Sequence, residues 1–266
     1  MITSTANQQV KQLIQLNKKR KLRDERGVFI AEGPKMIEEA PRERIEKVYV
    51  AAGYFEKYKE RLSLEELDYE LLEDSIFRTV SDTQTPQGIL AMIRQESSSL
   101  EAMLRPEHPL LLLLENIQDP GNLGTILRTA EGAGVTGVIL SKGCVDLYNP
   151  KTIRSTMGSV YRVPTLYAEN LCEMVSVLHE KGVRTFAAHL AGKNEYDQED
   201  YRGGSAFLIG NEGNGLTEEL SACADTLIRI PMEGRLESLN AGVAASVLMY
   251  EAYRQRRRAG SGRQNY

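Results

Sequence analysis

Apolar and polar positions alternate along the chain in blocks that favour strands and helices in turn. Five consecutive leucines at residues 110–114 form an unbroken apolar run, which is typical of a strand buried on both faces. After a break at 119–121, apolar residues recur with helical spacing at Leu123, Ile126, Leu127 and Ala130. A further apolar run at 135–140 completes a predicted strand-helix-strand unit.

The stretch GAGVTG at residues 132–137 fits the spacing of a dinucleotide-binding loop. In such a loop the glycines follow a strand and open a helix. Here they follow the predicted helix and precede the next strand, where Gly132 and Gly134 suit the left-handed backbone of a helix end. The pattern is inverted, so we reject a nicotinamide-dependent oxidoreductase.

The same patterning divides the chain into two α/β domains. Short apolar runs alternate with helical stretches over residues 1–95, and a serine-rich, proline-containing linker occupies 96–108. The second domain is expected at 109–258 and a flexible basic tail at 259–266. Its predicted strands imply a mostly parallel, covered sheet and lie at 110–115, 137–140, 184–188, 206–210 and 227–230.

Composition narrows the class of protein further. With 266 residues, 41% apolar and 26% charged, the chain is typical of globular proteins. No run approaches the roughly 20 apolar residues of a membrane span, and the N-terminus lacks the apolar core of a signal peptide, so we expect a cytoplasmic protein. The three cysteines and three histidines are scattered, which predicts neither a disulfide framework nor a metal site.

Charge is segregated although the net charge is only −4. Residues 1–30 carry seven lysines and arginines against two acidic residues, and residues 254–266 carry five arginines and no acid. Clustered cations release counterions from a phosphate backbone, so they favour nucleic-acid binding. Taken alone, the pattern is equally compatible with a solvated helix face and a frayed tail.

Three loops of the second domain combine glycine, asparagine and serine directly after predicted strands: ENIQDPGN, IGNEGNGL and IPMEGRLESLNAG. The carboxyl ends of parallel strands meet at one edge of a sheet, so the loops are expected to form one composite site. Arg128 is expected to point away from the packing face of its helix. Taken singly, Asn122, Ser238 and Asn240 could equally be helix caps, and Glu212 a turn residue.

Together and in this order, three motifs resemble those of the SpoU/TrmH family of the SPOUT superfamily, RNA 2′-O-ribose methyltransferases that use S-adenosylmethionine. The motifs are NIQDPGNLGTILRTA, FLIGNEGNGL and IPMEGRLESLNAGVAASVLMYE. Residues 1–95, with RGVFIAEGPKMIEEA and VSDTQTPQGILAM, are similar to the L30e-like substrate-binding domain that many members carry ahead of the catalytic domain. The resemblance covers nearly the whole chain.

The resemblance implies an L30e-like domain followed by a SPOUT α/β domain with a C-terminal trefoil knot. It implies that S-adenosylmethionine lies against backbone at Gly210, Ile230 and Leu239, that the protein is a homodimer with its active site assembled across the two-fold axis, and that no metal is needed. The catalytic residues implied are Arg128, Asn122, Glu212, Ser238 and Asn240. A guanidinium stays protonated, so Arg128 is expected to grip phosphate and stabilise the developing oxyanion rather than act as a base.

The substrate implied is RNA, with ribosomal (23S) RNA favoured. The expected RNA-binding cations are Lys18, Lys19, Arg20, Lys21 and Arg23. Two alternatives remain open: a transfer-RNA 2′-O-ribose methyltransferase, and a non-catalytic RNA-binding or ribosome-assembly factor.

Overall fold

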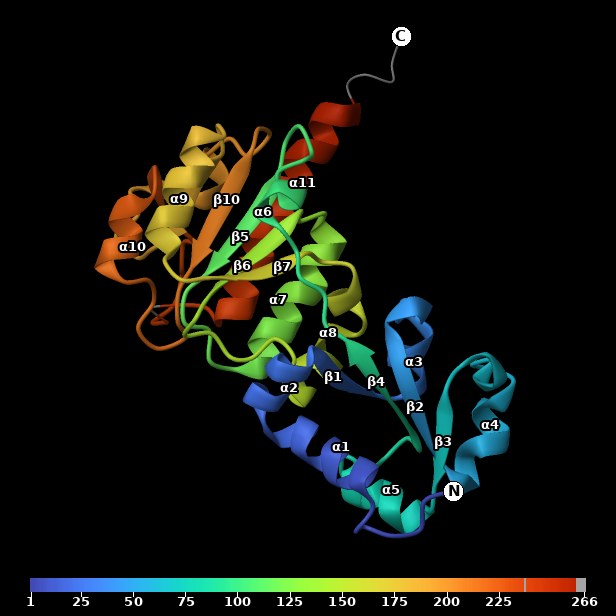
Figure 1. Cartoon of the computed structure of the whole chain (residues 1–266). Helices are drawn as coiled ribbons and strands as arrows, with labels where there is room; N and C mark the ends of the chain where they lie inside the picture. Colours follow the sequence, from blue (N-terminus) through green and yellow to red (C-terminus); the bar gives the residue numbers. More distant parts are fainter. Residues whose placement is uncertain (237, 262–266) are drawn as a thin grey trace. The chain divides into compact units, whose positions relative to one another are not determined.

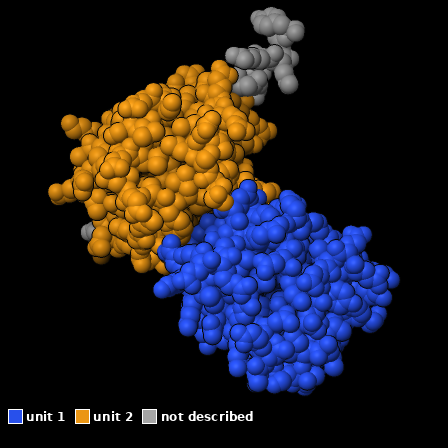
Figure 2. All heavy atoms as spheres, in the orientation of Figure 1, with its two compact units in different colours: residues 1–96, 146–161 blue, residues 97–145, 162–266 orange. Residues whose placement is uncertain are grey.

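The computed structural model describes residues 1–236 and 238–261, with side chains described as far as residue 258. The chain forms two compact units, coloured separately in Figure 2. The first unit contains residues 1–96 and 146–161, and the second contains residues 97–145 and 162–266. The segment 146–161, assigned to the second domain from the sequence, therefore groups with the first unit.

A four-stranded sheet forms the centre of the first unit, in the order β1-β4-β2-β3 (Figure 1). Its strands are β1 (Val28–Glu32), β2 (Ile45–Ala51), β3 (Tyr69–Leu72) and β4 (Ile89–Arg94). β4 pairs antiparallel with both β1 and β2, while β2 and β3 run parallel. Alternate side chains of each strand point to opposite faces, which gives this sheet two hydrophobic cores.

Helices cover both faces of this sheet. The helices of the first unit are α1 (Gln8–Lys18), α2 (Arg20–Arg26), α3 (Pro34–Glu38), α4 (Phe55–Lys59), α5 (Asp74–Val80) and α8 (Pro150–Thr156), with short 3-10 turns at Arg42–Arg44, Ala52–Tyr54, Leu64–Glu66 and Ser159–Tyr161. Leu13 of α1 and Phe77 of α5 belong to one core. The other core contains Tyr58 of α4, Ile153 of α8 and Tyr161, so apolar packing explains why 146–161 joins this unit.

The second unit is built on a seven-stranded parallel sheet, in the order β7-β6-β5-β10-β8-β11-β9. Its strands are β5 (Leu110–Leu114), β6 (Gly137–Ser141), β7 (Thr165–Ala168), β8 (Arg184–Ala188), β9 (Asn194–Glu195), β10 (Ser205–Ile209) and β11 (Thr226–Arg229). The five strands predicted from the sequence are all present, and β7 and β9 are additional. Leu111 of β5 lies opposite Ala206 of β10 on one side and Gly137 of β6 on the other.

Two helical layers enclose the seven-stranded sheet (Figure 1). The helices of the second unit are α6 (Leu100–Met103), α7 (Pro120–Ala133), α9 (Leu171–Glu180), α10 (Glu218–Cys223) and α11 (Ala241–Ser261), with a 3-10 turn at Tyr196–Gln198. α9 and α10 share a core with one face of the sheet, whereas α7 and α11 pack against each other. α6 lies within the expected linker, and its Met103 is buried.

The ends of α7 and α11 differ in part from what the sequence predicted. Gly134 ends α7 in the left-handed conformation at φ 72°, as expected, whereas Gly132 is helical. α11 continues to Ser261, so the beginning of the expected flexible tail is helical, and residues 262–266 lie outside the described part of the chain. The trefoil knot implied by the resemblance stays a prediction.

Candidate active site

A cavity of about 280 Å³ opens in the second unit where β8, β10 and β11 end. Its walls come from the residues that follow these strands and from the start of α11. Five of the expected site residues line it: Gly210, Glu212, Ile230, Ser238 and Leu239. The expected convergence of the second and third motifs at one place is therefore present in the structure.

The loop after β10 is held in one compact conformation. Asn211 and Gly215 exchange two backbone hydrogen bonds of 3.0 Å, and the Asn211 side chain accepts hydrogen bonds from the N–H groups of Gly213 and Asn214. A Cβ at Gly210 would lie 2.0 Å from the carbonyl carbon of Gly215, a separation that real atoms do not tolerate. Only glycine allows this close approach, which shapes the floor of the cavity.

A chain of side-chain hydrogen bonds connects all three motifs. Asn122 donates through Nδ2 to Glu212 Oε1 at 2.9 Å, and Asn122 Oδ1 accepts from Asn240 Nδ2 at 2.9 Å. Asn240 in turn accepts from the N–H groups of Gly242 and Val243, which caps α11. These side chains therefore hold the three loops together by hydrogen bonds. In the sequence, only the family resemblance relates the three residues to one another.

Glu212 is the centre of this network. Besides Asn122, its carboxylate accepts hydrogen bonds of 3.2 Å from the backbone N–H groups of Gln118 and Asp119. Partial burial raises the pKa of Glu212, but the hydrogen bonds outweigh that effect and hold its pKa below the ordinary value. The carboxylate is therefore ionised while it braces the first motif against the second.

Asn122 does not cap α7, although its position suggested that it could. Asp119 is the cap, since its carboxylate accepts the N–H of Asn122 at 2.9 Å. The side chain of Asn122 is free of that task and carries the contacts to Glu212 and Asn240 instead.

Arg128 occupies an exposed position on α7 and does not line the cavity of its own chain. Its guanidinium forms no hydrogen bond or ion pair within the described part of the chain. The neighbouring Leu127 is buried, which confirms that Arg128 points away from the packing face of α7. One copy of the chain therefore presents this cation to its surroundings rather than to its own cavity.

Most of the other residues around the cavity were not predicted from the sequence, and each of the three strand ends contributes some of them. His189 follows β8, Leu216 closes the loop after β10, and Met232 follows β11. The rule that ligands bind beyond the carboxyl ends of parallel strands could have identified the β8 loop, but its sequence HLAGKN lacks the density of glycine and asparagine seen in the other loops.

The lining of the cavity suits the base of a nucleoside. Apolar walls from Ala188, Leu216, Ile230 and Leu239 suit a flat aromatic base, and the close backbone at Gly210 leaves peptide groups near it. No group of three or more His, Cys, Asp and Glu side chains that could hold a metal ion occurs among the described residues.

The expected RNA-binding cations of the first unit differ in how exposed and how paired their side chains are. Lys18, Lys19 and Lys21 are exposed on or beside α1 and α2. Arg20 forms an ion pair in which its Nε lies 3.5 Å from Asp24 Oδ2. Arg23 is only 3% exposed, and the structure corrects its expected role.

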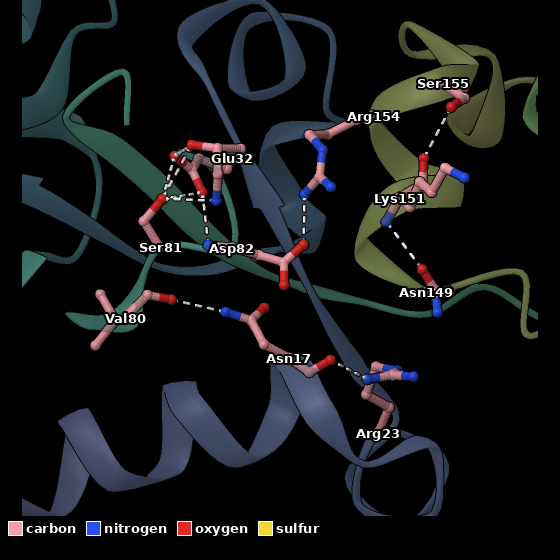
Figure 3. Close-up of polar contacts among 11 residues, drawn as sticks. Asn17, Arg23, Glu32, Val80, Ser81, Asp82, Asn149, Lys151, Arg154 and Ser155 are labelled. Atoms are coloured by element: carbon pink, nitrogen blue, oxygen red, sulfur yellow. Dashed lines mark hydrogen bonds and ion pairs between the residues drawn. The ribbon is translucent and has the colours of Figure 1, made fainter. Parts of the chain in front are cut away.

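Arg23 is part of a buried ion pair. Its Nε donates to Asp146 Oδ2 at 3.0 Å, and Nη2 contacts the same oxygen. Nη1 donates to the carbonyl oxygens of Leu16 and Asn17, and Figure 3 shows the guanidinium directed at Asn17. Because every side of the guanidinium is engaged inside the unit, Arg23 has no face left for RNA phosphate.

A second polar cluster fixes the loop after α5 in the first unit (Figure 3). The Glu32 carboxylate accepts hydrogen bonds from the hydroxyls of Ser81 and Thr83 and from the N–H of Asp82. Asp82 also accepts from Arg154 of α8 at 2.8 Å. These contacts tie α8 to the first unit at its surface, as the Arg23 pair does in its interior.

No helix among the described residues is both long enough and apolar enough to cross a membrane.

Comparison with known proteins identifies both parts of the chain. The family model described as SpoU rRNA Methylase family matches residues 109–250, and the model of the MRM3-like substrate binding domain matches residues 7–91. A relative from Bacillus subtilis (strain 168), named 23S rRNA (guanosine(2553)-2'-O)-methyltransferase RlmP, is 33% identical over 252 residues, which cover 94% of this chain and 97% of that protein.

Solved structures agree with the sequence comparison. The SpoU methyltransferase AviRb from Streptomyces viridochromogenes has a TM-score of 0.85 at 25% identity, with 95% of this chain and 99% of that chain covered. An AdoMet-bound rRNA methyltransferase from Sinorhizobium meliloti has a TM-score of 0.83 at 32% identity, with 95% and 97% covered. These matches confirm the α/β fold class and the resemblance drawn from the motifs. The chain therefore belongs to the SpoU rRNA methylase family and carries an MRM3-like substrate-binding domain ahead of its methylase domain.

Proposed function

We propose that the protein methylates a ribose 2′-hydroxyl of 23S ribosomal RNA with S-adenosylmethionine as methyl donor. The observation that carries the proposal is the hydrogen-bonded chain from Glu212 through Asn122 to Asn240, which joins the first motif to the two motifs that line the cavity. The relative that matches both domains is named as a 23S rRNA enzyme, which favours ribosomal over transfer RNA. The cytoplasm is the compartment proposed for such a substrate.

The cavity residues supply binding and orientation. S-adenosylmethionine held there would supply an activated methyl group on its sulfonium for transfer to the ribose oxygen. Gly210, Ile230 and Leu239 offer backbone groups to the adenine, and the apolar walls exclude water. Ser238 lines the cavity beside Leu239, which supports assigning it the orientation of the acceptor hydroxyl. Orienting the two reactants in this way lowers the activation free energy of such reactions by up to about 7 to 11 kcal/mol.

Arg128 holds the acceptor in this proposal. A guanidinium is an unsuitable base because it stays protonated, but its planar fork binds phosphate well. It grips the phosphate next to the target ribose and stabilises the negative charge that develops on the attacking oxygen. The proton leaves to the phosphate or to solvent while Ser238 and Asn240 hold the hydroxyl in place.

A homodimer would bring Arg128 to a cavity. Its own chain leaves Arg128 outside the cavity lining, so the proposed site combines one cavity with the partner's Arg128. An apolar stripe on α11 supports such an assembly: Val243 and Tyr250 are 48% and 50% exposed, and Tyr253 lies beside them. α7 packs along the same helix through Thr129 and Ser246, so the stripe and Arg128 belong to one two-helix layer. A two-fold symmetric dimer that buries this layer uses the same surface on both chains, so it does not grow into a longer assembly.

The decisive experiment is transfer of labelled methyl from S-adenosylmethionine to ribosomal RNA taken from cells that lack the protein. We expect one 23S nucleotide to gain a 2′-O-methyl group, mapped by primer extension. Arg128→Ala should lower the transfer rate by about 100- to 1,000-fold, the usual cost of losing one transition-state donor. Its affinity for S-adenosylmethionine, measured by calorimetry, should stay unchanged. Methylation of transfer RNA alone, or cofactor binding without transfer to any RNA, would replace this proposal with one of the two alternatives.

The shared site has its own test. Arg128→Ala and Gly210→Val chains should each be inactive alone, because one lacks the cation and the other lacks the cavity floor. Co-expressed in equal amounts, they should recover about a quarter of the wild-type rate, since half of the pairs are mixed and each mixed pair has one intact site. No recovery in a mixture shown to contain mixed dimers would place Arg128 and the cavity on the same chain.

A further inference from the structure

Two cysteines that are far apart in the sequence lie together in the second unit. Cys172 is in the first turn of α9, and Cys223 is the last residue of α10. The two helices pack against each other through a common core that contains Leu171 and Leu220. Both thiols are partly exposed and neither is in a disulfide.

The sulfur atoms meet at one carbonyl group. Cys223 Sγ lies 3.2 Å and Cys172 Sγ lies 3.8 Å from the carbonyl oxygen of Glu219. Burial raises the pKa of Cys172 to about 12, and the neighbouring Cys223 thiol adds to this effect. The two sulfur atoms are therefore brought to the same carbonyl oxygen from two different helices.

Cys144 provides the contrast within the same unit. It is buried, and its thiol donates to the carbonyl oxygen of Leu114 at 3.2 Å. Its nearest polar side chain is a serine, Ser141, and not a cysteine. Cys144 is therefore a core thiol, whereas Cys172 and Cys223 form a partly exposed pair that the proposed methyl transfer does not use.

We propose that Cys172 and Cys223 are a modification site at which a peroxide or a small disulfide forms an intrachain disulfide between α9 and α10. The inference does not depend on the proposed function. It does have a structural consequence for that function, because α10 begins directly after the loop of residues 210–216 that lines the cavity.

The two thiols are oxidised to one disulfide while the peroxide or the small disulfide is reduced. Since a thiolate is the attacking species, Cys172 is the resolving residue and Cys223 attacks first. With hydrogen peroxide, Cys223 becomes a sulfenic acid and one water leaves; the Cys172 sulfur then displaces the sulfenic oxygen as a second water. With glutathione disulfide, Cys223 forms a mixed disulfide and releases one glutathione thiol, and Cys172 releases the second.

The test uses the reduced full-length protein treated with glutathione disulfide. Thiol titration under denaturing conditions should fall from three groups per chain to one, with no bound glutathione by intact mass. Proteolysis without reductant should yield one cross-linked peptide pair that contains Cys172 and Cys223. Cys144→Ser is the matched control and should form the same bridge, with its titre falling to zero.

Two variants make the outcome decisive. In Cys172→Ser the remaining Cys223 should keep one glutathione, because no neighbouring thiol can displace it. Cys223→Ser should react more slowly than Cys172→Ser, because its remaining thiol has the raised pKa. Wild-type protein that ends with glutathione on either cysteine, or that links only between chains, would overturn the proposal. Unchanged circular dichroism of each variant ensures that these results concern the folded protein.

Discussion

The basic helices at the start of the first unit and the polar loops of the second unit both hold polar side chains that pair with distant parts of the chain, but the two regions use them differently. In the first unit Arg23 is buried against Asp146, and its role is to hold the segment 146–161 in place. In the second unit Asn122, Glu212 and Asn240 stay accessible while they bond to one another. A buried charge whose partners all lie inside the unit is costly to disrupt, whereas polar groups that are pre-ordered and still accessible suit ligand binding.

Breaking the buried pair should have the largest effect on stability. Arg23→Ala leaves the Asp146 carboxylate buried without its partner, so we expect a loss of about 3 to 5 kcal/mol in the free energy of unfolding. Urea denaturation measures this loss from the unfolding transition of the first unit. Lys18→Ala, an exposed change on the neighbouring helix, should stay within about 0.5 kcal/mol of wild type. Equal effects of the two substitutions would mean that burial does not distinguish these cations.

Removing the central asparagine of the second region should act on catalysis and much less on stability. Asn122→Ala cuts the link between Glu212 and Asn240, and misplacement of these loops should slow methyl transfer about 100-fold. Single-turnover rates measure this. Asn170→Ala is the matched control: Asn170 caps α9 in the same unit, so its loss should weaken that helix and leave the transfer rate near wild type. A comparable rate loss in both variants would argue against the special role of the hydrogen-bonded chain.

Acid should loosen the same loops in a defined direction. The folded-state pKa of Glu212 lies below its ordinary value of 4.5, so its stabilising contacts are complete above that pH and disappear as the pH falls through the folded pKa. We expect hydrogen exchange at the Gln118 and Asp119 amides to become faster only below about pH 4.5, after correction for the intrinsic rate. Glu212→Gln should show fast exchange without this pH dependence. An exchange profile that is flat in wild type would remove Glu212 from the network.

Neutralising the exposed lysines should give the smallest effect and one that depends on salt. The triple variant Lys18→Ala, Lys19→Ala and Lys21→Ala should bind RNA a few-fold more weakly, with a salt slope reduced by about 0.7 to 0.9 for each RNA phosphate that a lysine no longer neutralises. Affinity for S-adenosylmethionine should not change. A triple variant at Lys35, Lys57 and Lys59, which carry the same charge on α3 and α4, is the control. An equal decrease of RNA affinity in both triples would show that only total charge matters.

Local sequence predicted much of the second unit. The leucine run at Leu110–Leu114 is a buried strand, and the helical spacing after it is α7. β7 and β9 were missed because they are short, with four and two residues, and lie at the two edges of the sheet, where burial is incomplete. Neither strand has a long enough apolar run to stand out from its neighbours.

The site was predictable as a set of loops but not as a network. Family resemblance brought Asn122, Glu212 and Asn240 together as residue types, and the structure added their hydrogen bonds. Proximity in the sequence misled for Arg23, which sits in a run of exposed cations yet turns inward to Asp146. Sequence proximity gave no sign of the neighbouring positions of Cys172 and Cys223, which depend on how α9 and α10 pack.

The sequence by itself determined the periodicity of each element, the glycines at tight backbone positions and the membership of the family, because these depend on residues within a few positions or on whole motifs. Only the tertiary structure decided which arginine is buried, that 146–161 packs with the first unit, and which two thiols share one carbonyl oxygen. The physical reason is that burial and pairing are set by the packing of elements distant in the chain, and the same side chain is a surface cation or an interior anchor according to what covers it.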